Sequence, residues 1–289
     1  SRFHRMTPRS WLFVPADDSA RLDKAAGRGA DALIIDLEDG VTPSAKAAAR
    51  VNLRNYLNEN APRLREVGAP KIWVRINPTP ELFQADLDAA LVPGLSGIVL
   101  AKAERPQQVS MVVNRIQQSG LPDVGLMPLI ETGLAVFSVA DIAAVSGVTH
   151  LQVGEADLRA DLGVTFGREE SELTVVRQRV VIVCAALGLP APIAPVSVEF
   201  RDLDLFAEST RRLARMGYVG RSCIHPAQVD VVNALFTPSE DELAAAARLV
   251  AQADAAAATG QGAFVDDAGR MVDEAIVRSA RRTLEMGMR

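Results

Sequence analysis

Cysteine is nearly absent from this sequence. The two that occur, Cys184 and Cys223, are far apart and show no CxxC spacing. A disulfide framework or a zinc knuckle needs more cysteines at closer spacing, so neither is expected. Two reduced, buried thiols in a cytoplasmic protein are the simplest interpretation.

Long apolar runs are also missing. No stretch of about 18 apolar residues occurs, so we expect no membrane-spanning helix. The first ten residues, SRFHRMTPRS, carry positive charge but no apolar segment, which is not the pattern of a secretory signal. Neither GxGxxG after the first strand nor GxxxxGK[ST] is present, so the usual phosphate-binding loops are excluded.

Positive charge is not in excess. The 31 Lys and Arg residues stand against 36 Asp and Glu, a formal net charge of −5, and no long basic run is visible. Nucleic acid is therefore disfavoured as a main partner, because phosphate binding needs clustered basic residues. A small anionic substrate remains open, since one or two well-placed arginines can bind it.

Short apolar runs alternate with helical stretches over residues 1–235. Apolar runs separated by helices indicate a parallel sheet covered on both faces, and eight repeats favour a (β/α)8 TIM barrel, an α/β fold. The predicted strands are 10–15, 32–38, 71–76, 97–102, 125–131, 150–153, 192–196 and one within 218–225, and the predicted helices are 19–28, 43–58, 106–119, 132–145, 170–187 and 203–216.

Residues 236–289 follow the predicted barrel as a C-terminal helical extension. Helices are expected at 239–258 and 274–285, with a hairpin between them in AFVDDAGRMVD whose turn is Asp-Ala-Gly. Such an extension must pack somewhere, so we expect it to pack on a neighbouring subunit or to form a lid over the active face.

Charged residues stand at the ends of several predicted strands. In barrels of this kind the active site lies at the C-terminal ends of the strands. Burying an unpaired charge costs several kcal/mol, so such groups should be paired or bound to a ligand. They are Asp36, Glu38 and Asp39 at the end of strand two, Arg75 in strand three, Lys102 at the end of strand four, Glu131 at the end of strand five, and Glu155 and Asp157 after strand six.

Oxygen ligands dominate this set. Glu131 and Asp157 suit a hard cation such as Mg²⁺, with Mn²⁺ as a second option, and nearby His or Cys ligands for zinc are lacking. Arg75 and Lys102 would balance the negative charge of a substrate. The alternative for each carboxylate is a helix cap or a salt bridge; Asp36 in particular would then hold Arg75 or a backbone loop.

Several motifs in order resemble the citrate lyase β-subunit-like family, within the HpcH/HpaI aldolase superfamily, over nearly the full length. They are RSWLFVP, ALIIDLEDGV, VRIN, LIET, GEADLRADLG and GYVGRSCIHPAQVDVVNALF. The resemblance implies a (β/α)8 barrel that binds Mg²⁺. It also implies that Glu131 and Asp157 are the metal ligands, with Ala156 beside them at the substrate, and that Arg75 contacts the substrate thioester oxygen.

Further roles follow from the same resemblance. The acidic residues Asp36, Glu38 and Asp39 would lie near the water shell of the metal and take part in catalysis. Asp273 would reach the site of a neighbouring subunit, in a homotrimer or hexamer. Phe13 and Lys24 match positions at the edge that binds coenzyme A.

Some positions depart from the family pattern. Asp18 stands where the family often has an arginine for the coenzyme A phosphates, and Arg21 is the residue that would substitute. A common Asp near strand seven is replaced by Ala194, and the usual Pro-Lys after strand four is Ala101–Lys102. We therefore expect an intact metal site and an altered recognition of the acyl carrier.

The resemblance implies a Mg²⁺-dependent carbon–carbon lyase. The substrate would be a 3-hydroxyacyl thioester such as citramalyl-CoA, malyl-CoA or a citryl thioester, cleaved reversibly to an acetyl thioester and a 2-oxo acid. One alternative is a metal-dependent aldolase on free 2-oxo acids, which Asp18 favours and an extension bearing Asp273 disfavours. Another is a carrier-protein-dependent lyase subunit with citrate-lyase-type partner subunits.

Overall fold

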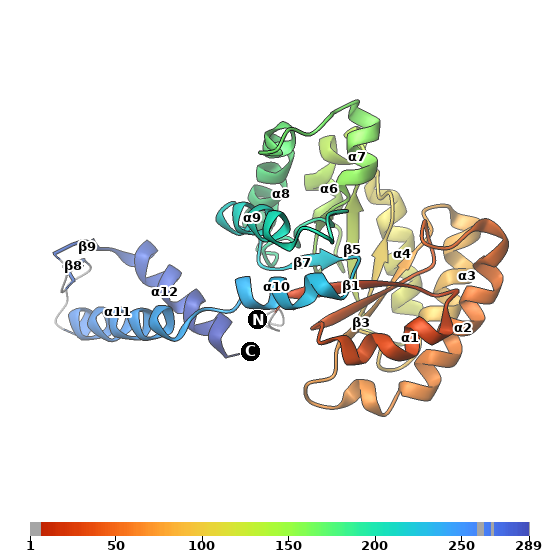
Figure 1. Ribbon diagram of the computed structural model, residues 1–289, viewed down its shortest axis with the longest axis horizontal. Coiled ribbons are helices and arrows are strands. Elements are labelled where there is room, and N and C mark those ends of the chain that lie inside the picture. The colour runs from red at the N-terminus through yellow and green to blue at the C-terminus, as the bar shows by residue number, and fades with distance from the viewer. Residues whose placement is uncertain (1–6, 259–262, 267–268, 289) are drawn as a thin grey trace. The chain divides into compact units, whose positions relative to one another are not determined.

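The computed structural model describes residues 7–258, 263–266 and 269–288. The chain divides into two compact units, residues 7–233 and 234–288, which are described separately (Figure 1). Two segments discussed from the sequence lie partly outside the described residues. They are the predicted Asp-Ala-Gly turn, of which Gly269 is described, and the first ten residues, of which the last four are described.

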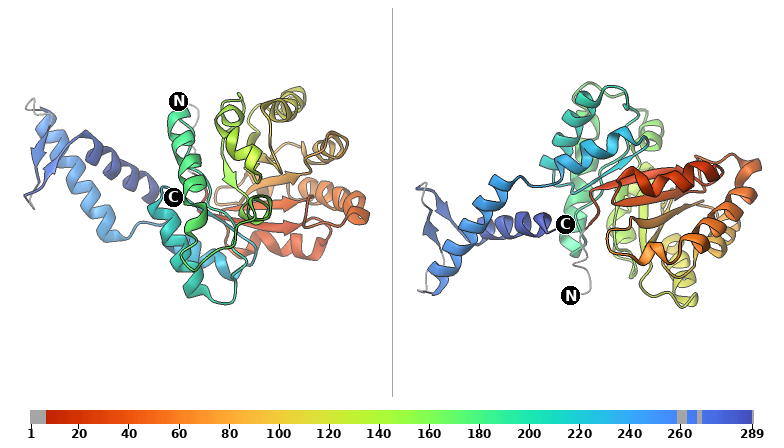
Figure 2. Two further views of the ribbon diagram at one scale, coloured as in Figure 1. Left: turned by 90° about the horizontal axis from the view of Figure 1, so that it is seen from above. Right: turned by 60° about the horizontal axis from the view of Figure 1, so that its bottom comes forward.

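The first unit is built on one parallel sheet in the order β6-β5-β4-β3-β2-β1-β7. Its helices lie outside the strands, as Figures 1 and 2 show. The strands are β1 (Ser10–Pro15), β2 (Ala32–Asp36), β3 (Lys71–Ile76), β4 (Gly97–Leu100), β5 (Gly125–Ile130), β6 (Gln152–Val153) and β7 (Arg221–Cys223).

Two residues close this sheet into a ring. Ile193 forms a parallel bridge with Gln152 of β6, and Ala194 forms one with Arg221 of β7. The segment predicted as a strand at 192–196 is thus reduced to these bridges, because the prolines within and before it donate no N–H to a ladder. Counting this position, the predicted (β/α)8 barrel is confirmed.

The predicted helices of this unit are all present, the one at 132–145 as two short helices, and three further helices were missed. The helices of this unit are α1 (Ser19–Ala25), α2 (Lys46–Asn60), α3 (Pro80–Ala90), α4 (Pro106–Gln118), α5 (Gly133–Phe137), α6 (Val139–Ala143), α7 (Glu155–Leu162), α8 (Thr174–Leu187), α9 (Leu203–Arg215) and α10 (Ala227–Leu235), whose last two residues fall in the second unit. The missed helices are α3, α7 and α10. Acidic residues in the first turn of α7 stabilise its start, and this places Asp157 on a helix.

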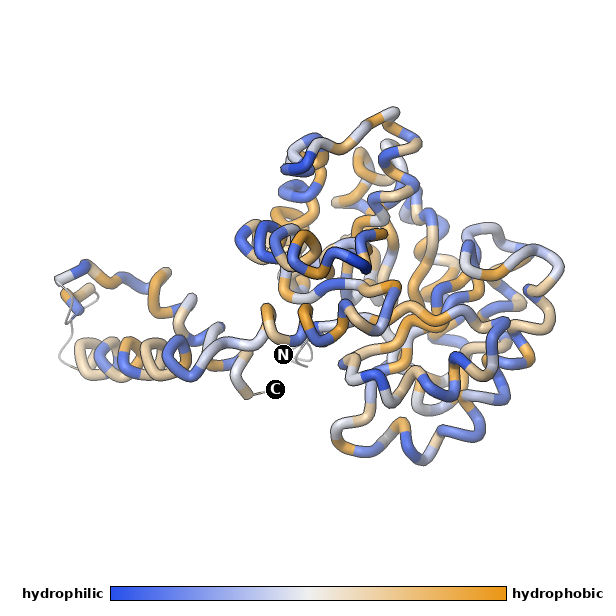
Figure 3. Tube along the Cα trace, viewed as in Figure 1, coloured by the Kyte–Doolittle hydropathy of each residue, from blue (hydrophilic) through white to orange (hydrophobic). Residues whose placement is uncertain are grey.

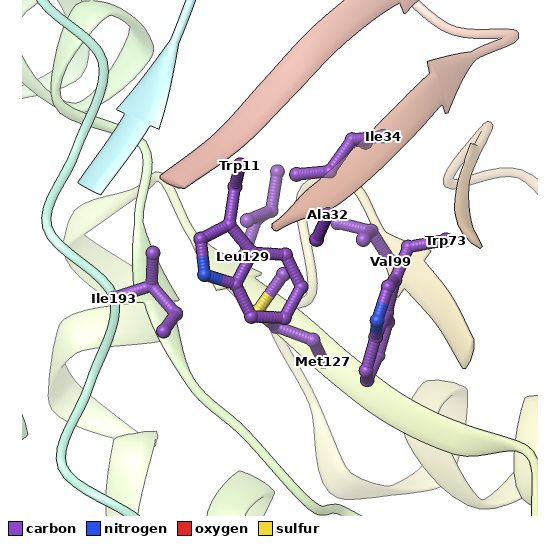
Figure 4. Packing of buried hydrophobic residues seen from close by; sticks show 8 residues of the cluster. All are labelled: Trp11, Ala32, Ile34, Trp73, Val99, Met127, Leu129 and Ile193. Atoms are coloured by element: carbon purple, nitrogen blue, oxygen red, sulfur yellow. The ribbon is translucent and has the colours of Figure 1, made fainter. Parts of the chain in front are cut away.

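The barrel interior contains an apolar cluster below the strand ends (Figure 4). Trp11 and Trp73 meet edge to face with ring centroids 5.3 Å apart. Gly97 of the neighbouring strand leaves the space for the Trp73 ring, since a Cβ there would overlap the indole. The central strands are hydrophobic while the surrounding helices alternate in hydropathy, as Figure 3 shows. The cluster also includes Ala32, Ile34, Val99, Met127, Leu129 and Ile193.

The second unit is a pair of helices joined by a short hairpin. Its elements are α11 (Glu240–Ala258), β8 (Phe264–Val265), β9 (Met271–Val272) and α12 (Glu274–Gly287). The two helices pack on each other, and an ion pair of 2.9 Å joins Arg281 to Asp254. The predicted helical extension is therefore present in the described residues, while its packing on a neighbouring subunit stays a prediction. No helix in the described part of the chain is long and apolar enough to cross a membrane.

Candidate active site

Asp36 and Arg75 are neighbours across two strands. The β2–β3 register pairs them directly, and Arg75 donates Nε and Nη2 to the two Asp36 oxygens at 2.7 and 2.6 Å. Asp36 also accepts the backbone N–H groups of Glu38 and Gly40 at 2.9 and 2.8 Å. Asp36 therefore holds both Arg75 and the loop after β2, as the alternative interpretation had it. The catalytic role predicted for Asp36 stays a prediction.

Glu38, two residues after the end of β2, is the second carboxylate beside Arg75. It is buried, with 3.3 Å between Arg75 Nη1 and Glu38 Oε2 and a close contact to the Lys102 ammonium. Burial raises the pKa of Glu38, although both cations oppose the shift. Asp39 is exposed, and Lys102 lies 3.0 Å from it. Burial would raise the pKa of Asp39, but the hydrogen bond and charge of Lys102 outweigh it and lower the pKa.

Lys102 connects the remaining acidic groups. It follows β4 with φ of 47°, a left-handed conformation that is uncommon for residues other than glycine. Its N–H donates to Glu131 Oε2 at 2.7 Å, and its ammonium lies 3.6 Å from Asp157 Oδ2. The residue predicted to balance substrate charge is therefore engaged with the carboxylates of the protein itself.

Glu131 follows β5 and is 4% exposed. Burial raises its pKa to about 7, and the charges of Glu38 and Asp157 act in the same direction. Gly154 is required beside it, because a Cβ at that position would overlap the Glu131 carboxylate. A buried carboxylate is costly unless a cation or hydrogen bonds compensate it, so this geometry suits a bound cation.

The donor set fits a hard cation. Glu131 and Asp157 offer only oxygen atoms, and Asp157 is partly exposed on α7. Within the described residues, no group of three or more His, Cys, Asp and Glu side chains is arranged to hold a metal ion. A Mg²⁺ ion held by this pair would take its other ligands from water and substrate, which is how Mg²⁺ commonly binds.

One cavity of ≈ 590 Å³ joins the two predicted halves of the site. Arg75 and Glu131 line it together with Phe13, Arg21 and Lys24, so two of the residues predicted for chemistry share one space with those predicted for coenzyme A. The Arg75 guanidinium also lies over the Phe13 ring, 4.9 Å from its centroid.

Arg28 lines the same cavity and was missed from the sequence. It lies four residues after Lys24 and seven after Arg21, a spacing that places the three cations on one side of a helix. That spacing was the available signal. Arg21 is paired with Asp18 at 3.2 Å, so the substitution noted at Asp18 engages the arginine proposed to replace it.

Gln152 of β6 is a second missed residue. Its Nε2 donates to the Ala194 carbonyl at 3.2 Å and to Ser222 Oγ at 2.5 Å. Its Oε1 is buried without a hydrogen-bond partner in the described residues, and the side chain lines the cavity. A polar residue inside the short apolar run HLQV was the signal for it.

Three residues singled out from the sequence, two after β6 and one in the C-terminal extension, do not line this cavity. Glu155 forms a buried bidentate pair with Arg177 at 2.6 and 2.7 Å, so it is structural. Ala156 is exposed in the first turn of α7, and its substrate contact stays a prediction. Asp273 belongs to the second unit and caps α12 by accepting the Ile276 N–H at 3.0 Å. Its predicted role in a neighbouring site stays a prediction.

Two related proteins match nearly the whole chain. Citramalyl-CoA lyase of Rattus norvegicus is 28% identical over 301 residues, covering 98% of this chain and 87% of that protein. A (3S)-malyl-CoA thioesterase of Cereibacter sphaeroides is 32% identical over 283 residues, covering 97% and 95%.

A solved structure agrees with these relatives. The crystal structure of the protein CitE from Mycobacterium tuberculosis, in complex with magnesium, acetoacetate and coenzyme A, is 30% identical, with a TM-score of 0.78. The match covers 99% of this chain and 100% of that chain. The model of the HpcH/HpaI aldolase/citrate lyase family matches residues 9–226. Together with the barrel and its acidic strand ends, these matches establish that the chain belongs to the HpcH/HpaI aldolase/citrate lyase family.

Proposed function

We propose that this protein is a Mg²⁺-dependent carbon–carbon lyase. Its substrate is a 3-hydroxyacyl thioester of coenzyme A, such as citramalyl-CoA or malyl-CoA, cleaved to acetyl-CoA and a 2-oxo acid. The observation that carries the proposal is the buried Glu131 carboxylate, which shares one cavity with the Arg75 guanidinium and the cations of α1. The named lyase relative and the complex with magnesium and coenzyme A support it.

Glu131 and Asp157 are the residues that would hold the metal. When bound, Mg²⁺ supplies a Lewis acid for the carboxylate end of the substrate. Lys102 keeps one Glu131 oxygen in place through its N–H. The burial of Glu131 excludes competing water from this side of the cavity, which strengthens electrostatic interactions there.

Arg75 stabilises the charge that develops during cleavage. The bond between the hydroxyl-bearing carbon and the carbon next to the thioester carbonyl breaks, and its electron pair moves toward the thioester oxygen. The hydroxyl loses its proton and becomes the new carbonyl, while the other carbon gains a proton to form the acetyl group. A guanidinium held in place by Asp36 is preorganised to bind the developing oxyanion.

Arg75 also stays charged throughout. Burial alone would lower the pKa of Arg75, but hydrogen bonds to Asp36 and its charge outweigh that effect and raise the pKa. Arg75 is therefore suited to electrostatic stabilisation and unsuited to proton transfer.

The proton on the acetyl carbon needs a separate group. We assign it to Asp273 of a neighbouring copy in a homotrimer or hexamer, on the resemblance set out above. Asp273 is the N-cap residue of α12 and is exposed, so a partner molecule could approach its carboxylate, one oxygen of which accepts the Ile276 N–H. Citrate-lyase-type partner subunits and a cytoplasmic location stay predictions.

Coenzyme A would be bound at the α1 edge of the cavity. Lys24 and Arg28 line this edge and offer two cations for phosphate oxygens, while Arg21 is partly neutralised by Asp18. The same edge holds Phe13. An aldolase acting on free 2-oxo acids would have no use for cations this far along the cavity wall.

A second candidate is a thioesterase. The relative named (3S)-malyl-CoA thioesterase favours it. Hydrolysis gives free coenzyme A and an intact hydroxy acid, whereas carbon–carbon cleavage gives acetyl-CoA and a 2-oxo acid. The products therefore separate the two activities.

The test is a product assay with citramalyl-CoA, malyl-CoA and citryl-CoA. The purified protein is assayed with Mg²⁺, with Mn²⁺ and with a chelator, and acetyl-CoA, 2-oxo acid and free coenzyme A are measured. Metal-dependent formation of acetyl-CoA and 2-oxo acid in equal amounts is expected. Glu131→Ala should abolish it, and Glu59→Ala, an exposed position on α2, should not.

The outcomes against the proposal are equally definite. Undiminished cleavage by Glu131→Ala, or cleavage that ignores the chelator, contradicts the metal site. Free coenzyme A as the main product supports the thioesterase. A melting temperature unaffected by coenzyme A, together with cleavage of free hydroxy acids, supports the aldolase. Activity that appears only with co-purified subunits supports a carrier-protein-dependent lyase.

A further inference from the structure

Lys102 contacts both residues assigned to the metal. Its backbone N–H donates to Glu131 Oε2 at 2.7 Å, and its ammonium lies 3.6 Å from Asp157 Oδ2. The same ammonium contacts Glu38 and lies 3.0 Å from Asp39. One residue therefore contacts four of the carboxylates predicted to lie around the metal, Glu38, Asp39, Glu131 and Asp157.

The backbone of Lys102 is arranged for this double contact. A φ of 47° is unfavourable for a lysine, and such conformations are kept where the surrounding structure demands them. Here the left-handed turn directs the N–H to Glu131 while the side chain extends to the carboxylates after β2 and in α7. The two functions of Lys102 are thus joined in one local conformation.

The charges around it explain what the ammonium does. Arg75 is committed to Asp36 and Glu38. In the described part of the chain, Asp157 has one ion-pair partner, Lys102. Carboxylates this close together repel each other unless a cation lies among them.

We propose that Lys102 is the counter-cation of the metal-free site and competes with Mg²⁺ for Asp157. It keeps the acidic cluster Glu38, Asp39 and Asp157 ordered before the metal arrives. When Mg²⁺ binds, the ammonium withdraws from Asp157 and keeps its nearer contacts to Glu38 and Asp39. Lys102 therefore lowers the affinity for Mg²⁺ and makes the metal exchangeable.

The geometry favours this exchange. The contact to Asp157 is the longest of the ammonium contacts, and the lysine side chain is about one-third exposed, so it is free to move outward. An ammonium on a flexible four-carbon stem changes partners more easily than a planar arginine fork. The inference rests on Glu131 and Asp157 as metal ligands, which is part of the proposed function.

The experiment measures Mg²⁺ binding directly, by isothermal titration calorimetry on the purified full-length protein. Lys102→Met removes the charge and keeps the length of the side chain, Lys102→Arg keeps the charge, and Lys71→Met removes an exposed lysine at the start of β3 as the matched control. We expect Lys102→Met to bind Mg²⁺ at least about tenfold more tightly, since removing a nearby cation strengthens cation binding. Lys71→Met should stay within about threefold of the unaltered protein. Lys102→Arg keeps the charge on a fork that changes partners less easily, so it should bind Mg²⁺ no more tightly than the unaltered protein.

A second measurement reports on the metal-free state. Without Mg²⁺, Lys102→Met should melt at least about 3 °C below the unaltered protein, because its acidic cluster has lost its counter-cation. Saturating Mg²⁺ should remove most of that difference. This pairing of lower metal-free stability with tighter metal binding is specific to a competing counter-cation.

Each result decides between stated outcomes. Equal or weaker Mg²⁺ binding by Lys102→Met, when the unaltered protein binds the ion, overturns the role given to Lys102 and leaves the proposed function in place. No Mg²⁺ binding by either protein contradicts the metal site and with it the proposed function. Tighter binding by the control Lys71→Met would show that the effect is general to surface charge, and this also overturns the inference.

Discussion

The barrel interior has two levels on the same strands, and they differ in chemistry. On β2, Ile34 is followed two residues later by Asp36, and on β3, Trp73 is followed by Arg75. Residues two apart on a strand share a face, so both levels point into the barrel. The lower level packs as the apolar cluster, while the upper level forms the Asp36–Arg75 pair.

This difference separates stability from function. Burying the apolar side chains of the lower level away from water stabilises the fold. At the upper level, buried ion pairs contribute little net stability, because removing their charges from water is costly. A protein that keeps several charged groups there has a use for them. The two levels should therefore respond differently to substitution.

The largest effect is expected for Arg75→Met at the upper level. It leaves Asp36 and Glu38 buried without their partner, which should cost about 3–5 kcal/mol of stability and lower kcat by about 10²–10³. Urea unfolding and the product assay measure the two effects. Adding Asp36→Asn should restore most of the stability and none of the activity. Recovery of activity in the double variant would mean that Arg75 is purely structural.

Trp73→Ala tests the lower level. It should cost about 3–5 kcal/mol, because a large cavity opens beside Trp11. At a temperature where the protein is still folded, the affinity for Mg²⁺ should be unchanged. Urea unfolding and calorimetry give both numbers, and Trp73→Phe should cost less. If Trp73→Ala weakened Mg²⁺ binding as much as it weakened the fold, the two levels would not be separable.

Gly154→Ala is a smaller and more local perturbation of the upper level. The added Cβ overlaps the Glu131 carboxylate, while the Gly154 φ of −95° is open to alanine. Displacing one metal ligand should weaken Mg²⁺ binding by about 10–100-fold. Gly27→Ala is the control, since a Cβ there meets nothing within 4 Å. Equal affinities in the two variants would show that Glu131 is not a ligand.

The mildest perturbation is a change of pH. The pKa of Glu131 is raised from 4.5 to about 7 by burial. Mg²⁺ needs the ionised form, so affinity should rise about tenfold per pH unit up to pH 7 and then level off. The folded metal-free protein binds this proton more tightly than the unfolded chain. Its contribution to stability is therefore full below pH 4.5 and is lost as the pH rises through about 7. Glu131→Gln should remove both trends in calorimetry and urea unfolding.

The sequence predicted the elements with strong local patterns. The strand at Lys71–Ile76 has the predicted bounds, and β5 ends one residue before its expected limit, so Glu131 follows it directly. The segments that departed were those without such patterns. The strand at 192–196 is reduced to two bridges, and α7 lies where no helix was predicted. Periodicity reports neighbours along one element, and these segments depend on contacts with others.

The sequence by itself determined the barrel, the family and the acidic residues at the strand ends. The barrel and the acidic strand ends follow from residue type and spacing along the chain, and the family follows from the resemblance of several motifs in order. The tertiary structure decided which of these charged residues contact one another. Lys102 meets Glu131 across 29 residues and Glu38 across 64, and Asp36 meets Arg75 across 39. Such contacts depend on strand register and on one left-handed backbone turn, which no local pattern encodes. The fold also brought Arg28, which follows α1, and Gln152 of β6 to the cavity wall.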